Sequence, residues 1–337
     1  MIKKILFLGA LIWFMTADLK SQDIHFTSYD FSPLTLNPAL AGGFSGSYRI
    51  GGIYRDQWRS VAGSGGYKTP TVHIDVPLMR GFREKDWIGV GVGVYSDRSS
   101  QYDLVQNKSF QGVSYHLSLD KKQQRILAFG VQNGTGTRKV QGANLRTETA
   151  IRSLQSGGSP AYLDDDLIMN TQGGTIVDWV GGVTFSSYQR NQSFIRAGVS
   201  VGRITRPNQG FANSTDRKRL KYTAFALCDA PLTGKLFLTP SVMYVRTGVN
   251  QQLVAQGKLS YLLDESKGVF LNGGLGFRAG DAIQLLAGMD YKDIKVQLAY
   301  DINVSGLSGA SNTVGAFEYF RVEDDLVESS DVQINNN

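Results

Sequence analysis

The stretch Trp87-Ile-Gly-Val-Gly-Val-Gly-Val-Tyr95 places a glycine at every second position between aliphatic residues. In an extended strand, Ile88, Val90, Val92 and Val94 share one face and the three glycines share the other. A strand of a soluble sheet usually turns its second face to water. Here that face carries almost no side chains, as expected if it faces a confined interior. The stretch therefore predicts a β-strand between lipid on its apolar face and an interior on its glycine face.

The same period of two recurs along the chain, with apolar residues on one face and polar or small residues on the other. This pattern is typical of a transmembrane antiparallel β-barrel and predicts an all-β fold. We expect about fourteen strands, at residues 46–59, 67–80, 87–97, 108–119, 124–134, 174–187, 193–204, 217–228, 235–247, 251–263, 268–279, 282–291, 294–304 and 312–322. Strands of about ten residues suit a tilted bilayer crossing, and an even number of strands returns both termini to the periplasm.

The expected connections differ in length on the two sides of the barrel. The longest connection, 135–173, follows the fifth strand, and 98–107 and 205–216 follow the third and seventh. Connections after even-numbered strands are short. Since outer-membrane barrels carry their long loops outside and short turns in the periplasm, these three connections should be extracellular.

The segments outside the barrel have their own composition. Residues 1–21 combine a basic start with a short apolar run and are expected to be a secretory signal peptide. Residues 22–45 form an N-terminal arm, residues 46–322 the barrel, and residues 323–337 an acidic periplasmic tail. The formal net charge of +6 is too mild to indicate a nucleic-acid partner.

The arm has the composition of an ordered, irregular segment. Asn37-Pro-Ala-Leu-Ala-Gly-Gly43 is turn and cap chemistry, and aromatic residues such as Phe26 and Phe31 make the arm too apolar to lie free in water. We expect it to pack inside the barrel as a plug. The glycine face at Gly89, Gly91 and Gly93 would provide the room.

Charged residues of both signs fall on the inward face of the expected strands and predict ion pairs that fill the lumen. They are Arg49, Arg55, Arg59, Asp75, Arg196, Lys258, Arg278, Asp290, Lys295, Asp301 and Glu318. The three histidines lack a metal-binding spacing, and Cys228 is the only cysteine, so we expect no enzyme, cofactor or metal. The acidic triplet Asp164-Asp165-Asp166 lies in the longest connection and reads either as part of a solvated loop or as partner-binding. It lacks the oxygen spacing of a known calcium loop.

Several landmarks resemble those of the PorP/SprF family of type IX secretion system membrane proteins from the Bacteroidetes. They include Gln22-Asp-Ile-His-Phe26, Asn37-Pro-Ala-Leu-Ala-Gly42, Tyr54-Arg-Asp-Gln-Trp58, Asp75-Val-Pro-Leu78 and Leu298-Ala-Tyr-Asp301. The order and spacing of the second and third elements is the most specific part. One departure is Gly315-Ala-Phe-Glu318, where the family often has a Gly-Ser-His-Glu stretch.

The resemblance implies an outer-membrane barrel that helps to export a large adhesin or enzyme, or holds it at the cell surface, by binding its C-terminal domain. Other type IX components and outer-membrane lipid would be further partners, and in gliding bacteria the exported protein can be a motility adhesin. The alternative is a porin-like or hydrophobic-solute channel. The residues expected to line the lumen or contact the partner are Arg55, Gln57, Asp75, Arg196, Arg278, Asp301, Glu318, Asp164, Asp165 and Asp166. Those expected to be structural are Asn37, Pro38, Ala39, Gly42 and Trp58.

Overall fold

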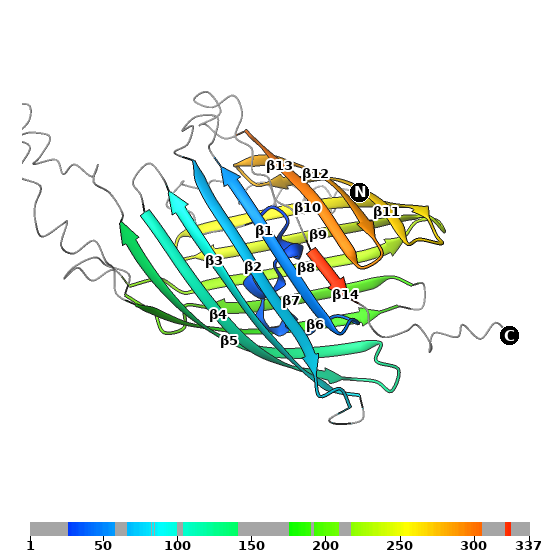
Figure 1. The fold of residues 1–337 in the computed structure, drawn as a ribbon, viewed down its shortest axis with the longest axis horizontal. Coiled ribbons are helices and arrows are strands. Elements are labelled where there is room, and N and C mark those ends of the chain that lie inside the picture. The colour runs from blue at the N-terminus through cyan, green and yellow to red at the C-terminus, as the bar shows by residue number, and fades with distance from the viewer. Residues whose placement is uncertain are drawn as a thin grey trace, which may run out of the picture.

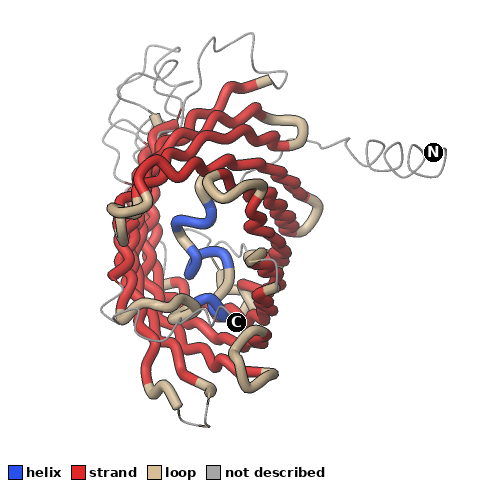
Figure 2. The backbone as a smooth tube through the Cα atoms, turned by 90° about the vertical axis from the view of Figure 1, so that its right-hand side faces the viewer, coloured by secondary structure: helices blue, strands red, loops and turns tan. Residues whose placement is uncertain are grey.

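The computed structural model describes residues 26–57, 66–81, 83, 85–99, 104–140, 175–189, 192–208, 217–304 and 321–324. Within these ranges the chain forms a closed barrel in which each strand pairs with its sequence neighbours and β1 pairs with β14 (Figures 1 and 2). All strand pairs are antiparallel. This confirms the fourteen-stranded transmembrane barrel that the alternation predicted.

The strands are β1 (Tyr48–Gln57), β2 (Tyr67–Leu78), β3 (Trp87–Ser99), β4 (Leu104–Ser118), β5 (Arg125–Val140), β6 (Ile176–Tyr188), β7 (Phe194–Gly202), β8 (Lys221–Pro231), β9 (Leu236–Thr247), β10 (Asn250–Asp264), β11 (Val269–Arg278), β12 (Ala282–Tyr291), β13 (Ile294–Asn303) and β14 (Arg321–Asp324). The pair Tyr48–Asp324 places the start of β1 and the end of β14 at the same end of the barrel.

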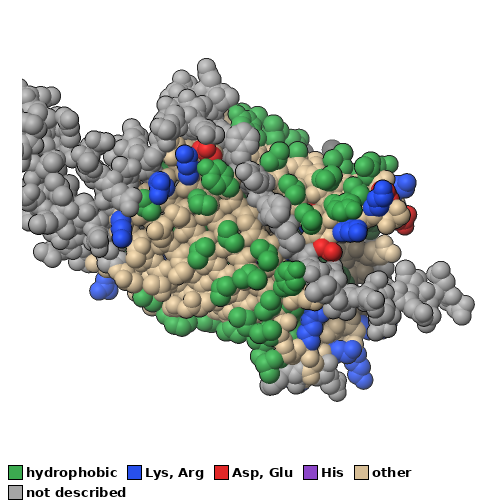
Figure 3. Space-filling view, in the orientation of Figure 1, with side chains coloured by type: hydrophobic (Ala, Val, Ile, Leu, Met, Phe, Trp, Pro, Cys, Tyr) green, Lys and Arg blue, Asp and Glu red, His purple; other side chains and the backbone are tan. Residues whose placement is uncertain are grey.

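The two faces of the wall follow the period of two. Val72, Val92, Val94 and Leu275 are exposed on the outer face, whereas His73 and the β3 glycines are buried on the inner face. In Figure 3, hydrophobic side chains gather on the outer face and Lys and Arg lie toward its two ends. The outer face is therefore the lipid-facing surface of a membrane barrel. Among the described residues, no helix is long and apolar enough to cross a membrane.

Strands β3, β4 and β5 are longer than the alternation predicted. The expected loop at 98–107 is wrong, because β3 continues to Ser99 and β4 already begins at Leu104. The ladder continues through polar pairs such as Asp97–Gln106. Where strands project beyond lipid, both faces meet polar surroundings and the apolar alternation disappears while the backbone hydrogen bonds persist. The alternation therefore marks the lipid-crossing part of a strand rather than its full length.

The last strand also differs from its expected position. The prediction was 312–322, and the strand that closes the barrel is Arg321–Asp324, while residues 312–320 lie outside the described part of the chain. Glu323 and Asp324, which we assigned to the acidic tail, pair with Arg49 and Tyr48 of β1.

The N-terminal arm lies inside the barrel, as expected. It consists of three short helical turns, η1 (Tyr29–Phe31), α2 (Pro33–Leu36) and η2 (Pro38–Leu40). Figure 2 shows these turns enclosed by the strands. Residues 22–25 and the expected signal peptide lie outside the described residues. Nearly all side chains from Phe26 to Gly42 are buried, so the arm forms the core of the barrel.

Candidate functional site: the arm and the lumen wall

Three strands of the wall contact the arm through glycine. A Cβ atom at Gly89 of β3 would overlap the carbonyl oxygen of Ala41, and one at Gly130 of β5 would overlap the backbone of Pro38 and Ala39. On β6, a Cβ atom at Gly182 would overlap the side chain of Asn37. The arm therefore lies on the bare backbone of the barrel, at a distance that only glycine permits.

Not every inward glycine serves the arm. A Cβ atom at Gly91 would lie 2.8 Å from Leu34 Cδ1, so Gly89 and Gly91 confirm the predicted role of the glycine face. Gly93 does not. The space above it is filled by the ring of Phe110 from β4 and by the side chain of His73 from β2. There, glycine allows side chains of neighbouring strands to lie flat along the wall.

The Asn37–Gly43 motif shows why these residue types occur in this order. The Asn37 side chain accepts a hydrogen bond from Ala39 N (2.9 Å) and donates to the carbonyls of Val183 (3.2 Å) and Val199 (2.9 Å). Pro38 occupies the first position of η2, where its fixed φ suits the turn. Asn37 thus caps the turn and ties it to β6 and β7.

Position 42 of the motif requires glycine for two physical reasons. Its φ of +61° is unfavourable for a residue with a side chain, and an added Cβ would lie 2.7 Å from the Cα of Gly89. Its backbone N–H donates to Asp75 Oδ2 (2.7 Å), and its carbonyl accepts from the indole N–H of Trp87 (2.9 Å). The glycine is therefore held from three sides.

Three side chains hold this part of the arm: Arg49 of β1, Asp75 of β2 and Arg196 of β7. We name these three residues the lower clamp. Arg49 donates through Nε (2.8 Å) and Nη2 (2.7 Å) to the two oxygens of Asp75, and through Nη2 to the Leu40 carbonyl (3.0 Å). Arg196 Nη2 donates to the Gly43 carbonyl (2.9 Å). Bidentate pairs of this kind are among the strongest hydrogen bonds in proteins. Charged residues that the alternation predicted to face inward thus hold the arm in place.

The carbonyl of Ala41 is a second fixed point. It accepts hydrogen bonds from Ser114 Oγ (2.7 Å) and from His116 Nε2 (2.7 Å), both on β4. Because a carbonyl only accepts, the proton of His116 must be on Nε2 in this contact. The His116 ring stacks on Trp87 with centroids 4.6 Å apart. The inward parity of His116 was visible in the sequence, but its partner was not.

A second buried network, the upper clamp, holds the start of the arm: Thr27, Gln256 of β10, Arg278 of β11 and Asp301 of β13. Arg278 Nη2 donates to Asp301 Oδ2 (2.7 Å), and Thr27 Oγ1 donates to Asp301 Oδ1 (2.9 Å). Gln256 Nε2 donates to the carbonyl of Thr27 (2.8 Å). Nothing in the sequence indicated that Gln256 contacts the arm, because polar inward residues are common in any barrel.

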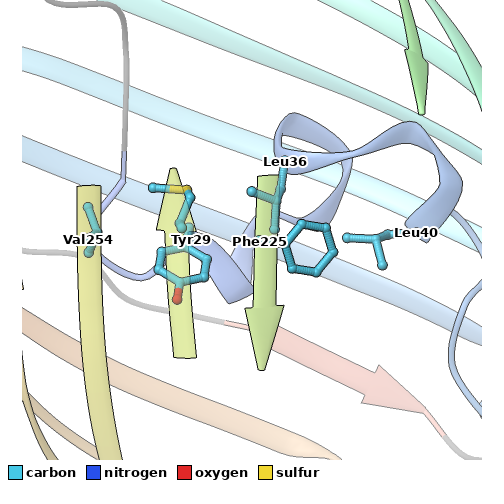
Figure 4. Packing of buried hydrophobic residues seen from close by; sticks show 6 residues of the cluster. Tyr29, Leu36, Leu40, Phe225 and Val254 are labelled. Carbon is cyan, nitrogen blue, oxygen red and sulfur yellow. The ribbon is translucent and has the colours of Figure 1, made fainter. Parts of the chain in front are cut away.

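The middle of the arm is held by apolar packing. Tyr29, Leu36 and Leu40 form a buried cluster with Phe225 of β8, Met243 of β9 and Val254 of β10. Figure 4 shows Leu36 and Leu40 facing Phe225. The Tyr29 hydroxyl donates to Ser241 Oγ (2.7 Å), and burial raises the pKa of this tyrosine. A cavity of about 30 Å³ lies beside Tyr29, between Asp30, Ser241, Gln256 and Leu286.

The structure places the other predicted site residues as follows. Arg55 is buried and Gln57 is the last residue of β1. Trp58, Glu318 and the triplet Asp164, Asp165 and Asp166 lie outside the described residues. Inward charges pair as Arg49–Asp75 and Arg278–Asp301, but within the wall instead of filling the lumen, and Lys258 pairs with Asp30 of the arm. Among the residues that the structure describes, no group of three His, Cys, Asp or Glu side chains could hold a metal ion.

A family model for "Type IX secretion system membrane protein PorP/SprF" matches residues 18–320, nearly the whole chain. The chain belongs to the PorP/SprF family. It is accordingly an outer-membrane β-barrel with a role in type IX secretion. Comparison with curated protein sequences found no match.

Several solved structures are similar to this chain. A TodX monoaromatic hydrocarbon channel mutant (deltaS2S3) has a TM-score of 0.51 and 11% identity, over 86% of this chain and 92% of that chain. The toluene transporters TodX of Pseudomonas putida (TM-score 0.48, 9% identity, 91% of this chain and 93% of that chain) and TbuX of Ralstonia pickettii (0.48, 11%, 87% and 94%) are also similar. At 11% identity the likeness to the TodX variant shows the fold alone.

Proposed function

We propose that this PorP/SprF barrel assists the export of a type IX substrate, or anchors it at the cell surface, by binding its C-terminal domain at the extracellular end of the barrel. Family membership supports the secretion role. The observation that carries the location is the packing of the arm: Asp75, Arg196, Arg278 and Asp301, four of the residues expected to meet a partner, are bonded to the arm. A partner therefore has to bind beyond the arm.

The proposed binding surface is formed by the extracellular connections. The longest connection joins the end of β5 at Val140 to the start of β6 at Ile176. The acidic triplet Asp164, Asp165 and Asp166 lies between these strands, and we assign it to partner contact. Binding is non-covalent and needs no cofactor.

The test is co-purification of the tagged barrel from native outer membrane, followed by a binding assay with the isolated C-terminal domain of any exported protein recovered. We expect such a protein to be recovered, and the triple Asp→Asn variant at 164–166 to bind its domain more weakly. Asp120→Asn, in the turn between β4 and β5 at the opposite end, is the matched control and should bind normally. Recovery of no exported protein would contradict the proposal.

The second candidate is a channel for hydrophobic solutes, because the TodX variant with the shared fold is a hydrocarbon channel. In this chain the described part of the lumen is occupied by the buried arm, so a solute path requires the arm to move. Uptake of a labelled aromatic solute by cells that lack the exported protein would favour this second function. Absence of such uptake would contradict the channel function and leave the export or anchoring role as the proposal.

A further inference from the structure

The two ends of the barrel can be told apart by their connections. The turns 79–86, 119–124 and 232–235 lie at one end, and the longer connections 141–175 and 203–220 lie at the other. Because outer-membrane barrels carry their long connections outside, the second end is extracellular. Strand β2 begins and strand β3 ends there, at Tyr67 and Ser99.

The outer face of these two strands changes from apolar to charged toward the extracellular end. Val72 and Val94 pair with each other and are 53% and 55% exposed. Four residues further along each strand, on the same face, are Lys68 and Arg98. At about 3.3 Å per residue and a tilt of about 45°, the two cations stand about 9 Å above the valines. Side chains of this length therefore reach the headgroups of the surrounding lipid.

The neighbouring strand β4 continues the polar surface beside the two cations. Beyond Val113, its outward positions are Gln111, Ser109 and Asn107, and all three side chains are exposed. Asn107 pairs across the ladder with Ser96 of β3, the outward residue just before Arg98. Hydroxyl and amide groups both donate and accept hydrogen bonds, as the hydroxyls of a sugar require.

Lys68 and Arg98 face each other directly across the β2–β3 ladder. Like charges in this position destabilise a sheet. Neither side chain makes an ion pair or a hydrogen bond with any residue that the structure describes. Asp56 of β1 lies opposite Lys68 in the register but is only 3% exposed, so the exposed charge is positive. Figure 3 shows Lys and Arg side chains at the upper left, where Figure 1 places these strand ends.

The cations of the lumen are arranged differently. Three of them each pair with an aspartate: Arg49, Lys108 and Arg278. Inside the barrel, positive charge is thus balanced by the protein itself. On the outer face of β2 and β3 the balancing anion has to come from outside the described chain.

We propose that Lys68 and Arg98 bind a phosphate group of a glycolipid in the outer leaflet of the membrane. Their surface is continuous with the lipid-facing valines of the same strands, so its neighbour is membrane lipid. Outer-leaflet glycolipids of bacteria carry phosphate groups on their sugars, and guanidinium and ammonium groups both donate to phosphate oxygens. The bound phosphate removes the repulsion between the two cations, and Ser96 and Asn107 contact the sugar. This contact is separate from the proposed binding of an exported partner.

The experiment measures lipid binding to the purified barrel in detergent micelles by native mass spectrometry. The probes are lipid A, a phosphorylated glycolipid, and the same lipid after enzymatic removal of its phosphates. The test variant is Lys68→Gln with Arg98→Gln. Lys121→Gln with Lys122→Gln, in the periplasmic turn between β4 and β5, removes two exposed cations at the opposite end and is the matched control.

We expect the test variant to bind phosphorylated lipid about 20- to 30-fold more weakly than the native barrel, because each Lys or Arg near an anionic membrane surface contributes about 1 kcal/mol, or about fivefold. The control should bind like the native barrel, and the dephosphorylated lipid should bind native and test variant equally. An equal loss in the control, or equal binding of the two lipids by the native barrel, would overturn the site. Competition by inorganic phosphate at the concentration of the lipid would place a free anion there and overturn the lipid contact.

Salt provides a test that needs no variant. Raising the NaCl concentration from about 0.1 M to about 1 M shortens the Debye length from about 10 Å to about 3 Å. Since Arg98 is exposed, binding of phosphorylated lipid to the native barrel should weaken several-fold, and binding of dephosphorylated lipid should not change. Binding of the phosphorylated lipid that is insensitive to salt would contradict an electrostatic contact.

Discussion

The wall from β3 to β6 and the wall from β9 to β13 hold the same arm in different ways. On the first wall, Gly89, Gly130 and Gly182 let the arm approach the strand backbone directly. On the second wall, long polar side chains such as Gln256, Arg278 and Gln297 reach in to the arm. Backbone contact leaves no space for added atoms, whereas a side-chain contact can be shortened or shifted. The first wall should therefore be far less tolerant of substitution than the second.

The largest expected effect is at Gly130. A leucine there would drive its side chain into the backbone of Pro38 and Ala39, so we expect Gly130→Leu to lower the free energy of unfolding by about 3 kcal/mol, the upper range for overpacking. Urea unfolding in lipid vesicles measures it. Gly273→Leu is the control, because its Cβ position on the exposed face of β11 is open. Equal losses in the two variants would show that the arm does not lie on β5.

A second prediction compares the two clamps. Asp75→Asn leaves the Arg49 guanidinium buried without its carboxylate, and loss of one partner of a buried pair costs about 3–5 kcal/mol when uncompensated. Since the Leu40 carbonyl also accepts from Arg49 and the asparagine oxygen can still accept one hydrogen bond, we expect a loss below that range, about 2 kcal/mol. Asp301→Asn should cost less, because Arg278 keeps its ion pair with Asp281. The same unfolding assay measures both, and a larger loss for Asp301→Asn would reverse the proposed ranking of the clamps.

The smallest expected effect is at Tyr29. Tyr29→Phe removes one hydrogen bond to Ser241 and should cost about 1 kcal/mol near neutral pH. Burial raises the pKa of Tyr29 above its ordinary value of 10.0, so above pH 10 the hydroxyl ionises in the unfolded chain before it does in the folded barrel. The stability advantage of the native protein over Tyr29→Phe should therefore shrink as the pH rises above 10. An advantage that grows with pH would contradict the buried, protonated hydroxyl.

Much of the barrel could be predicted from the sequence because lipid imposes a period of two on every crossing strand. Val92 and Val94 gave the outer face, and the polar or small positions gave the inner face. The ends of β3, β4 and β5 could not be predicted, because beyond the lipid both faces are polar and the pattern fades while the hydrogen-bonded ladder continues.

The site was predictable in its composition but not in its contacts. The apolar arm and the bare glycine face suggested an internal plug, and the inward charges suggested ion pairs. Periodicity assigns a residue to a face but does not say what lies across the lumen from it. Gly91 meets Leu34 of the arm and Gly93 meets Phe110 of the wall, although the two glycines are alike in the sequence. Likewise, nothing local showed that Arg278 bonds to Thr27 of the arm.

The measurement that tests the central claim most directly is the conductance of the purified barrel in planar lipid bilayers. If the arm fills the lumen as a fixed part of the core, the native barrel should show low conductance, and deletion of residues 26–40 should open a larger, steady conductance. The native barrel, measured in the same bilayers, is the reference for the deletion variant. A large, steady, ohmic conductance of the native barrel that the deletion leaves unchanged would contradict the account.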